Sequence, residues 1–109
     1  MKPVVWCGDS LERIREFPAD ARRSAGHQLD RVQRGLDPYD WKPMPSVGLS
    51  VREIRVHAQG QYCVVYLAKF EEAVYVLHAF AKKTQRTAKQ DLELATTRFR
   101  ELREERRRK

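Results

Sequence analysis

Residues 49–80, LSVREIRVHAQGQYCVVYLAKFEEAVYVLHAF, decide the fold, because turn residues divide them into three runs rich in apolar and β-branched side chains. The runs 49–56 and 62–70 flank the short, glycine-containing connection 57–61, and this arrangement predicts an antiparallel hairpin. Residues 73–80 are almost continuously apolar, as in a strand that is buried on both faces. The sequence therefore predicts a three-stranded meander.

The first of these strands has an irregular pattern. Its apolar residues change parity between Val51 and Ile54, so we expect a bulge or a twist there. The strand also contains Arg52 and Arg55, and arginine is unusual in a strand unless its face is solvated or paired. The pleat places Glu53 and Arg55 on one face. This pairing is open to two interpretations, a surface ion pair or a basic face that supplies cations to RNA phosphates.

Before the meander, the apolar residues recur at the spacing of helices. A first helix is predicted from Ser10 to about Phe17, where Pro18 forces a break. A second helix is predicted to follow and to end near Gly35, and its apolar stripe is formed by Ala21, Ala25, Leu29, Val32 and Leu36. We expect the two short helices to form an antiparallel hairpin.

Three further segments complete the predicted domain. Residues 3–7 predict a short strand that can extend the meander, and residues 37–48 predict a loop that is pinned by aromatic side chains. From Thr84 or Thr87 onward, apolar residues at alternating spacings of four and three predict a helix that starts with a Thr-x-x-Gln capping box. The last seven residues, 103–109, are expected to be a frayed helical end or a basic tail.

These elements predict one α+β domain over residues 1–109. An N-terminal helical hairpin packs on a twisted antiparallel sheet of about four strands, and a C-terminal helix closes the structure. The length of 109 residues is that of a single domain. It excludes a two-domain enzyme with its own cofactor fold.

The charge of the chain favours a polyanionic partner. Lysine and arginine number 22 against 15 acidic residues, which gives a net charge of +7 and a pI near 9.8. Residues 82–109 contain 11 basic and 5 acidic residues and so carry +6 of this excess. No run approaches the ~18 apolar residues of a membrane span, and residues 1–10 lack the apolar core of a secretory signal. We therefore expect a cytoplasmic protein without membrane attachment.

Neither the cysteines nor the histidines have the spacing of a metal site. Cys7 and Cys63 lack a CxxC partner, and the histidines at 27, 57 and 78 are scattered. We expect no metal and no cofactor. His78, within the apolar run VLHAF, is expected to be a core residue, whereas His57 starts a turn and is an accessible proton carrier.

The junction between the last predicted strand and the closing helix is the strongest candidate site. Residues 80–87 read FAKKTQRT, so Lys82, Lys83 and Arg86 surround Gln85 at the point where a helix begins. Ammonium and guanidinium groups, together with free backbone N–H groups, suit a phosphate. The alternative is an ordinary strand end that carries solvated lysines.

Several motifs together carry a family resemblance. They are VREIRV at 51–56, GQY at 60–62, VVY at 64–66, VLHAFAKKTQ at 76–85 and AKQDLELATTRFREL at 88–102. With the order of the elements, they resemble the RelE/ParE superfamily of toxins from bacterial type II toxin–antitoxin systems, and specifically its phage-derived HigB-like branch. The resemblance extends from about Val4 to Leu102.

The resemblance implies a ribosome-dependent endoribonuclease (mRNA interferase) that needs no metal, because the 2′-hydroxyl of the RNA attacks the adjacent phosphate. By the family pattern, Arg55 and Lys82 or Lys83 are catalytic cations. The implied RNA-binding residues are Arg52, His57, Gln85 and Arg86. The implied partners are a cognate antitoxin with a helix-turn-helix domain, the ribosome and mRNA, and operator DNA that is reached through the antitoxin.

Cys63 departs from this family pattern. The family usually has arginine after the tyrosine of the hairpin strand, as in YRVVY, whereas residues 62–66 read YCVVY. Loss of one cation that stabilises a transition state can lower a rate by about a hundredfold. Three explanations stay open: a natural variant with altered or weak activity, compensation by Arg52 or His57, and a substitution introduced so that a toxic protein could be produced. The alternative function is non-catalytic, either a ParE-like gyrase-directed toxin or a basic nucleic-acid-binding module.

Overall fold

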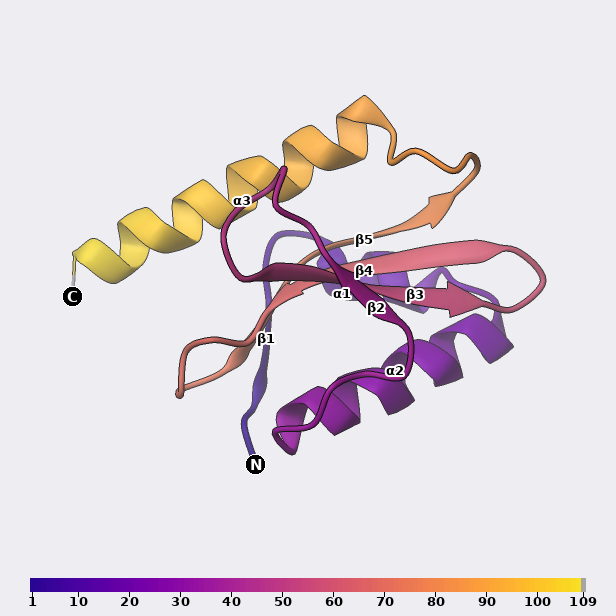
Figure 1. Cartoon of the computed structure of the whole chain (residues 1–109), viewed down its shortest axis with the longest axis horizontal. Helices are drawn as coiled ribbons and strands as arrows, with labels where there is room; N and C mark the ends of the chain where they lie inside the picture. Colours follow the sequence, from indigo (N-terminus) through magenta and orange to yellow (C-terminus); the bar gives the residue numbers. More distant parts are fainter. Residues whose placement is uncertain (109) are drawn as a thin grey trace.

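Residues 1–108, which the computed structural model describes, form five strands and three helices. In chain order they are β1 (Val4–Trp6), α1 (Ser10–Arg15), α2 (Ala19–Gln33), β2 (Trp41–Pro43), β3 (Val51–His57), β4 (Gln61–Leu67), β5 (Val74–Lys82) and α3 (Lys89–Arg107). The strands build one sheet in the order β1-β5-β4-β3-β2. Figure 1 shows α3 above this sheet and α2 below it. Within the described residues, no helix combines the length and the apolar surface that crossing a bilayer demands.

The α+β class is confirmed, but the predicted antiparallel sheet of about four strands is wrong in strand number and direction. The predicted loop 37–48 contributes an additional strand, β2, which pairs antiparallel with β3. This strand contains Pro43, and a proline is tolerated there because β2 lies at the edge of the sheet. At the opposite edge β1 runs parallel to β5, so the sheet is mixed.

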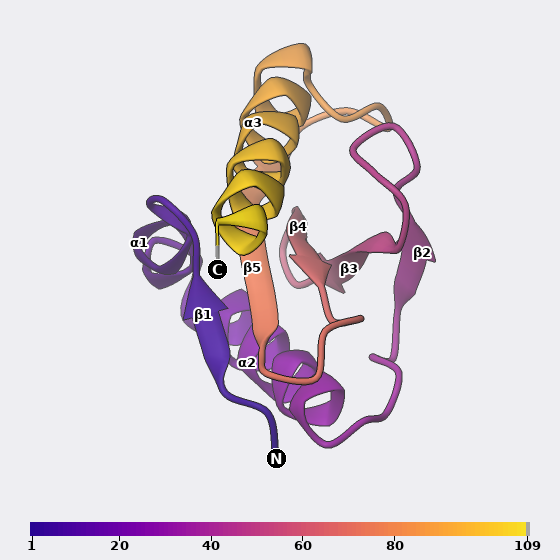
Figure 2. The same ribbon diagram turned by 90° about the vertical axis from the view of Figure 1, so that its left-hand side faces the viewer.

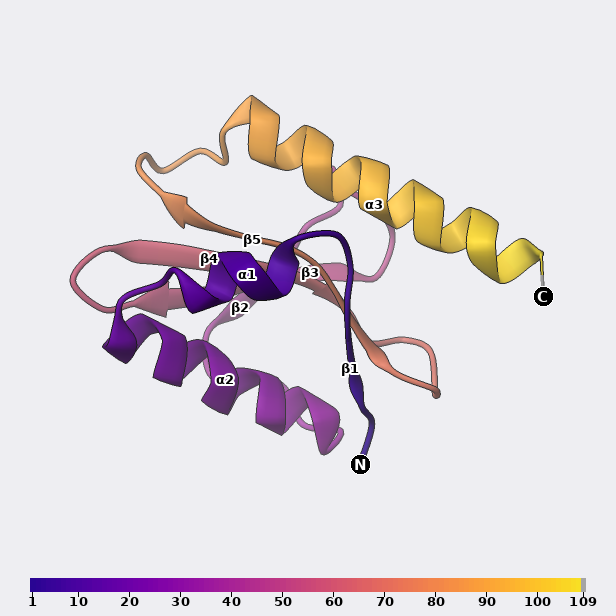
Figure 3. The ribbon, with the colours of Figure 1, turned by 180° about the vertical axis from the view of Figure 1, so that it is seen from behind.

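Residues 1–108 do not contain the clear helical hairpin that the sequence predicts. α1 has only six residues, and it packs against β5, whereas α2 packs against β3. Figure 3 shows the two helices side by side on the same face of the sheet. Each helix buries its own apolar residues on the strands, among them Ile14 of α1 and Leu29 of α2. The sheet, rather than contact between the helices, therefore determines where they lie.

Helices cover both faces of the central strands, as the end-on view in Figure 2 shows. Ile54 and Val64 belong to the core under α1 and α2, whereas Val51 and Val65 belong to the core under α3. β3 pairs with β4 without interruption from Val51 to His57, so the predicted bulge in β3 is wrong. The apolar pattern changes parity because both faces of this strand are buried.

The irregularity of the sheet lies in β5 instead. Val65 pairs with His78 and Tyr66 pairs with Val76, so Leu77 has no partner on β4. Such an extra residue re-aims the side chains beside it. As a result, Leu77 packs in the core under α3, and the neighbouring His78 also reaches that helix.

α3 is longer than the sequence predicts. It continues to Arg107, so most of the predicted tail 103–109 is helical, while Lys109 lies outside the described residues. Arg106 pairs with Glu72 in the turn before β5, which ties this end of the helix to the sheet. No side chain caps the first turn of α3, so the predicted capping box is wrong.

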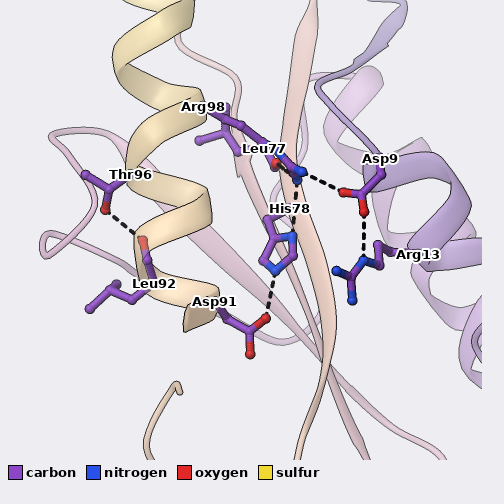
Figure 4. A network of polar contacts seen from close by, with 8 residues as sticks. All are labelled: Asp9, Arg13, Leu77, His78, Asp91, Leu92, Thr96 and Arg98. Carbon is purple, nitrogen blue, oxygen red and sulfur yellow. Dashed lines mark hydrogen bonds and ion pairs between the residues drawn. The ribbon is translucent and has the colours of Figure 1, made fainter. Parts of the chain in front are cut away.

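A polar network joins α3 to the sheet and to the start of α1 (Figure 4). Nη1 of Arg98 donates to the Leu77 carbonyl at 3.0 Å and to Nδ1 of His78 at 3.2 Å. Nη2 of Arg98 donates to Oδ1 of Asp9 at 2.6 Å. On the other side of the imidazole, Nε2 of His78 lies 2.8 Å from Oδ1 of Asp91. One arginine thus bridges the strand and the first helix.

These contacts determine the protonation state of His78. Arginine can only donate, so Nδ1 accepts and the ring proton sits on Nε2, where Asp91 accepts it. Burial lowers the pKa of His78, although the hydrogen bond to Asp91 opposes this effect. The side chain is fully buried, which confirms the expectation that His78 is a core residue.

The free energy of unfolding is expected to fall as the pH drops below the ordinary histidine pKa of 6.5. The pKa of His78 is lower in the folded chain than in the unfolded chain, so the unfolded chain takes up the proton first and protonation favours unfolding. Urea unfolding between about pH 7.5 and about pH 5.5 measures this loss. His78→Gln should flatten the pH dependence. Equal slopes for wild type and His78→Gln contradict the account.

Candidate functional site

A pocket of about 280 Å³ opens where β3 ends, β4 begins and β5 ends. Figure 1 shows these three strand ends together at the right-hand end of the sheet. The pocket is lined by Lys42, Arg55, His57, Gln61, Tyr62, Cys63, Lys82 and Gln85. Three of these side chains are lysine or arginine, so the pocket is suited to an anion.

The strand register brings these residues together. Arg55 pairs with Cys63, and Gln61 pairs with His57 on one side and with Lys82 on the other. Paired residues of antiparallel strands point to the same face of the sheet. The side chains of Arg55 and His57 are 40% and 57% exposed, so this end of the face is accessible.

Asp40 orients two side chains of the pocket. Its Oδ1 accepts from Nη2 of Arg55 at 2.9 Å and from Nε at 3.0 Å, and its Oδ2 lies 3.2 Å from Nε2 of His57. The backbone of Asp40 is itself fixed, because its N–H donates to Oε1 of Gln28 and its carbonyl accepts from the N–H of Arg55. Asp40 therefore positions Arg55 and His57, and its charge offsets part of the positive charge of the pocket.

A second carboxylate lies beside the pocket in the core. Glu53 is 1% exposed, and Nζ of Lys42 lies 3.4 Å from its Oε1. In the described part of the chain, this Oε1 accepts no hydrogen bond. A buried carboxylate needs charged or hydrogen-bonding partners. Glu53 therefore has room for a further donor on the face that also carries Cys63.

Cys63 is chemically inert in this position. Burial, together with the charge of the nearby Glu53, raises its pKa to about 11, although Lys82, Lys42 and Arg55 act in the opposite direction. The side chain is 1% exposed. Because the thiolate and not the thiol is the nucleophile, Cys63 cannot act as one at neutral pH.

The structure brings five of the predicted site residues into this pocket: Arg55, His57, Cys63, Lys82 and Gln85. Lys83 and Arg86 are exposed between β5 and α3 and lie outside the pocket lining. Arg52 is on the opposite face of the sheet, where it pairs with Tyr66 on β4 and its Nη1 donates to Asp37. The predicted RNA-binding residues therefore do not form one surface.

Sequence reasoning missed Asp40 and Lys42 because residues 37–48 predict a loop. The strand Trp41–Pro43 has only three residues, which is too short for a period of two to be recognised. The sequence also predicts that Gln61 lies in the turn of the hairpin, whereas it is the first residue of β4. Asp40 and Lys42 flank Trp41 in the sequence. These charges beside an aromatic side chain are the signal that could have assigned the segment to the site.

The arrangement of charges can bind a phosphate group and move a proton. Arg55 and Lys82 can donate to phosphate oxygens from neighbouring strands. His57, which Asp40 orients, can donate or accept a proton. Within residues 1–108, no three His, Cys, Asp or Glu side chains are grouped as a metal site requires.

The chain matches a family model over most of its length. The model described as "Phage derived protein Gp49-like (DUF891)" matches residues 12–100. The matched segment runs from α1 into α3 and includes every residue that lines the pocket. No curated protein matches the chain.

The thiol of Cys63 is expected to resist alkylation in the folded protein. A rise of the pKa from 9.0 to about 11 lowers the thiolate fraction about a hundredfold near neutral pH, and burial restricts access further. Iodoacetamide labelling followed by mass spectrometry measures the rate at each cysteine. Urea should raise the rate at Cys63 to that of an ordinary thiol. Rapid labelling of Cys63 without urea contradicts the assignment of an inert side chain.

Proposed function

The chain belongs to the Gp49-like family of phage-derived proteins, a toxin-like family associated with toxin–antitoxin systems, and on this premise we propose that it cleaves messenger RNA on the ribosome. The observation that supports this proposal is the pocket at the strand ends, where Arg55, His57 and Lys82 converge. Its contents match a reaction that needs charge stabilisation and one proton carrier. The resemblance of the motifs around 76–85 to mRNA interferases points to the same substrate.

In the proposed reaction the 2′-hydroxyl oxygen of a ribose bonds to the adjacent phosphorus, and the bond from phosphorus to the 5′-oxygen of the next nucleotide breaks. The products are a cyclic phosphate and a free 5′-hydroxyl. Arg55 and Lys82 stabilise the charge that develops on the phosphate oxygens. His57 takes the proton of the attacking 2′-hydroxyl and gives it to the leaving 5′-oxygen, and Asp40 holds its ring.

We also propose a protein partner for the chain. A toxin with this activity needs an antitoxin, and the resemblance implies one with a helix-turn-helix domain that also binds operator DNA. The net charge of +7 favours an acidic partner surface over the pocket. Co-expression with the product of a neighbouring short reading frame, followed by co-purification and a growth assay, tests this partner.

Lys82→Gln is expected to lower the cleavage rate about a hundredfold, because it removes a cation that faces the reacting phosphate. Lys83 is outside the pocket lining, so Lys83→Gln should have a much smaller effect. A translation extract with a defined message, read by primer extension, measures both rates. Lys89→Gln at the start of α3 is the matched control. A larger loss for Lys83→Gln than for Lys82→Gln contradicts the assignment of the pocket as the active site.

Cys63→Arg is expected to raise the cleavage rate by about tenfold or more. The new guanidinium would lie on the face that carries Arg55 and could donate to Oε1 of Glu53, which accepts no hydrogen bond within residues 1–108. Cys63→Lys and Cys63→Ala are the controls for charge and for loss of the thiol. If messages stay intact with wild type and with Cys63→Arg alike, the ribonuclease proposal fails.

A binding function is the second candidate, and two observations favour it. Cys63 stands where the related toxins have arginine, and Asp40 already occupies the guanidinium of Arg55. Both features weaken catalysis while leaving Lys82 available for phosphates. Salt-dependent binding of RNA without cleavage, or inhibition of gyrase supercoiling, would support this candidate.

A further inference from the structure

A second polar pocket lies at the other end of the sheet and on its opposite face. It has a volume of about 330 Å³ and is lined by Lys2, Val32, Gly35, Leu36, Asp37, Ser50, Arg52, Tyr66, Ala68 and Lys69. Its lining comes mainly from the C-terminal end of α2 and the segment after it, the start of β3 and the end of β4, away from the tip of the hairpin. None of its lining residues is shared with the pocket of Arg55 and Lys82.

Three cations meet in this second pocket. Nζ of Lys2 donates to the Ala68 carbonyl at 2.6 Å, which fixes the ammonium group at the pocket wall. The guanidinium of Arg52 stacks 4.0 Å from the centre of the Trp41 ring. Lys69 is exposed at the rim. The only carboxylate in the lining is that of Asp37, whose Oδ1 lies 3.1 Å from Nη1 of Arg52.

The decisive feature is the hydroxyl of Tyr66. This side chain is 1% exposed, and no group among residues 1–108 accepts the proton of its hydroxyl, whereas the guanidinium of Arg52 lies beside the hydroxyl oxygen. Burial raises the pKa of Tyr66, and the neighbouring Arg52 offsets this only in part, so the hydroxyl keeps its proton and remains a donor. A buried donor without an acceptor is unfavourable. A ligand that supplies an acceptor oxygen at this wall would satisfy it.

We propose that this pocket binds a phosphate group, whose oxygens accept from the Tyr66 hydroxyl and from the Arg52 guanidinium. The phosphate replaces Asp37 as the partner of Arg52, and the ammonium groups of Lys2 and Lys69 balance its second charge. The inference does not depend on the proposed ribonuclease activity. It assigns Arg52 to a phosphate site that is separate from the pocket of Arg55 and Lys82 on the other face of the sheet.

The test is a phosphate titration of the full chain, followed by the backbone amide resonances in nuclear magnetic resonance spectra. Gly35, Ser50 and Ala68 report the proposed site, whereas His57 and Gln61 report the other pocket. Because the two groups of signals are separate, failure of this proposal is distinguishable from failure of the proposed function. Inorganic phosphate and adenosine 5′-monophosphate are the two probes, and their relative affinities distinguish free phosphate from a nucleotide.

Two substitutions are expected to act in opposite directions. Tyr66→Phe should weaken phosphate binding at Gly35, Ser50 and Ala68 about tenfold, because it removes the donor and keeps the ring. Asp37→Asn should tighten binding severalfold, because it removes the competing carboxylate. A purely structural role of these residues predicts no gain of affinity.

Tyr75→Phe is the matched control, because its hydroxyl donates to Glu72 outside the proposed site. It should leave the titration unchanged. The proposal is overturned if phosphate leaves the three reporter amides unmoved. It is also overturned if Tyr66→Phe binds phosphate as wild type does, or if Asp37→Asn binds it more weakly.

Discussion

Burial of the central strands on both faces is the constraint on which the rest of this structure depends. α1 and α2 cover one face of β3, β4 and β5, and α3 covers the other. Polar side chains on these strands can then reach solvent only where a strand ends. The basic pocket forms at one such end, because β3, β4 and β5 stop there together. Arg98 holds α3 against its face of the sheet, because this side chain of α3 donates to His78 on β5 and to Asp9 before α1.

The sequence predicts the three central strands and both long helices, because their apolar patterns are long enough to show a period. It does not predict the pairing of β1 with β5 or the short strand β2, because three-residue strands carry no period. The parity change between Val51 and Ile54 has the physical cause that both faces are buried. A bulge in β5, by contrast, leaves no trace in a continuously apolar run, so the turn of His78 toward α3 could not be foreseen.

For the site, the sequence identifies the cations on the predicted strands but not their neighbours. Arg55, His57 and Lys82 meet because β3 pairs with β4 and β4 pairs with β5 in a fixed register. The predicted three-stranded meander already implies that these strands are neighbours. The alternation of the strand already places Arg52 and Arg55 on opposite faces, but which face carries the pocket depends on which face each helix covers. Asp40 is the largest omission, because it offsets the charge of Arg55 and orients His57. The pocket is therefore less basic than the sequence alone suggests.

The central claim is that RNA binds at the strand ends of the face that α3 covers. Titration of an uncleavable RNA oligonucleotide, followed by backbone amide resonances of the full chain, tests it directly. The account predicts that the largest changes occur at His57, Gln61 and Lys82, and that they weaken as salt is added. Changes that concentrate instead on the arginines at the C-terminal end of α3, with the hairpin signals unmoved, would contradict it.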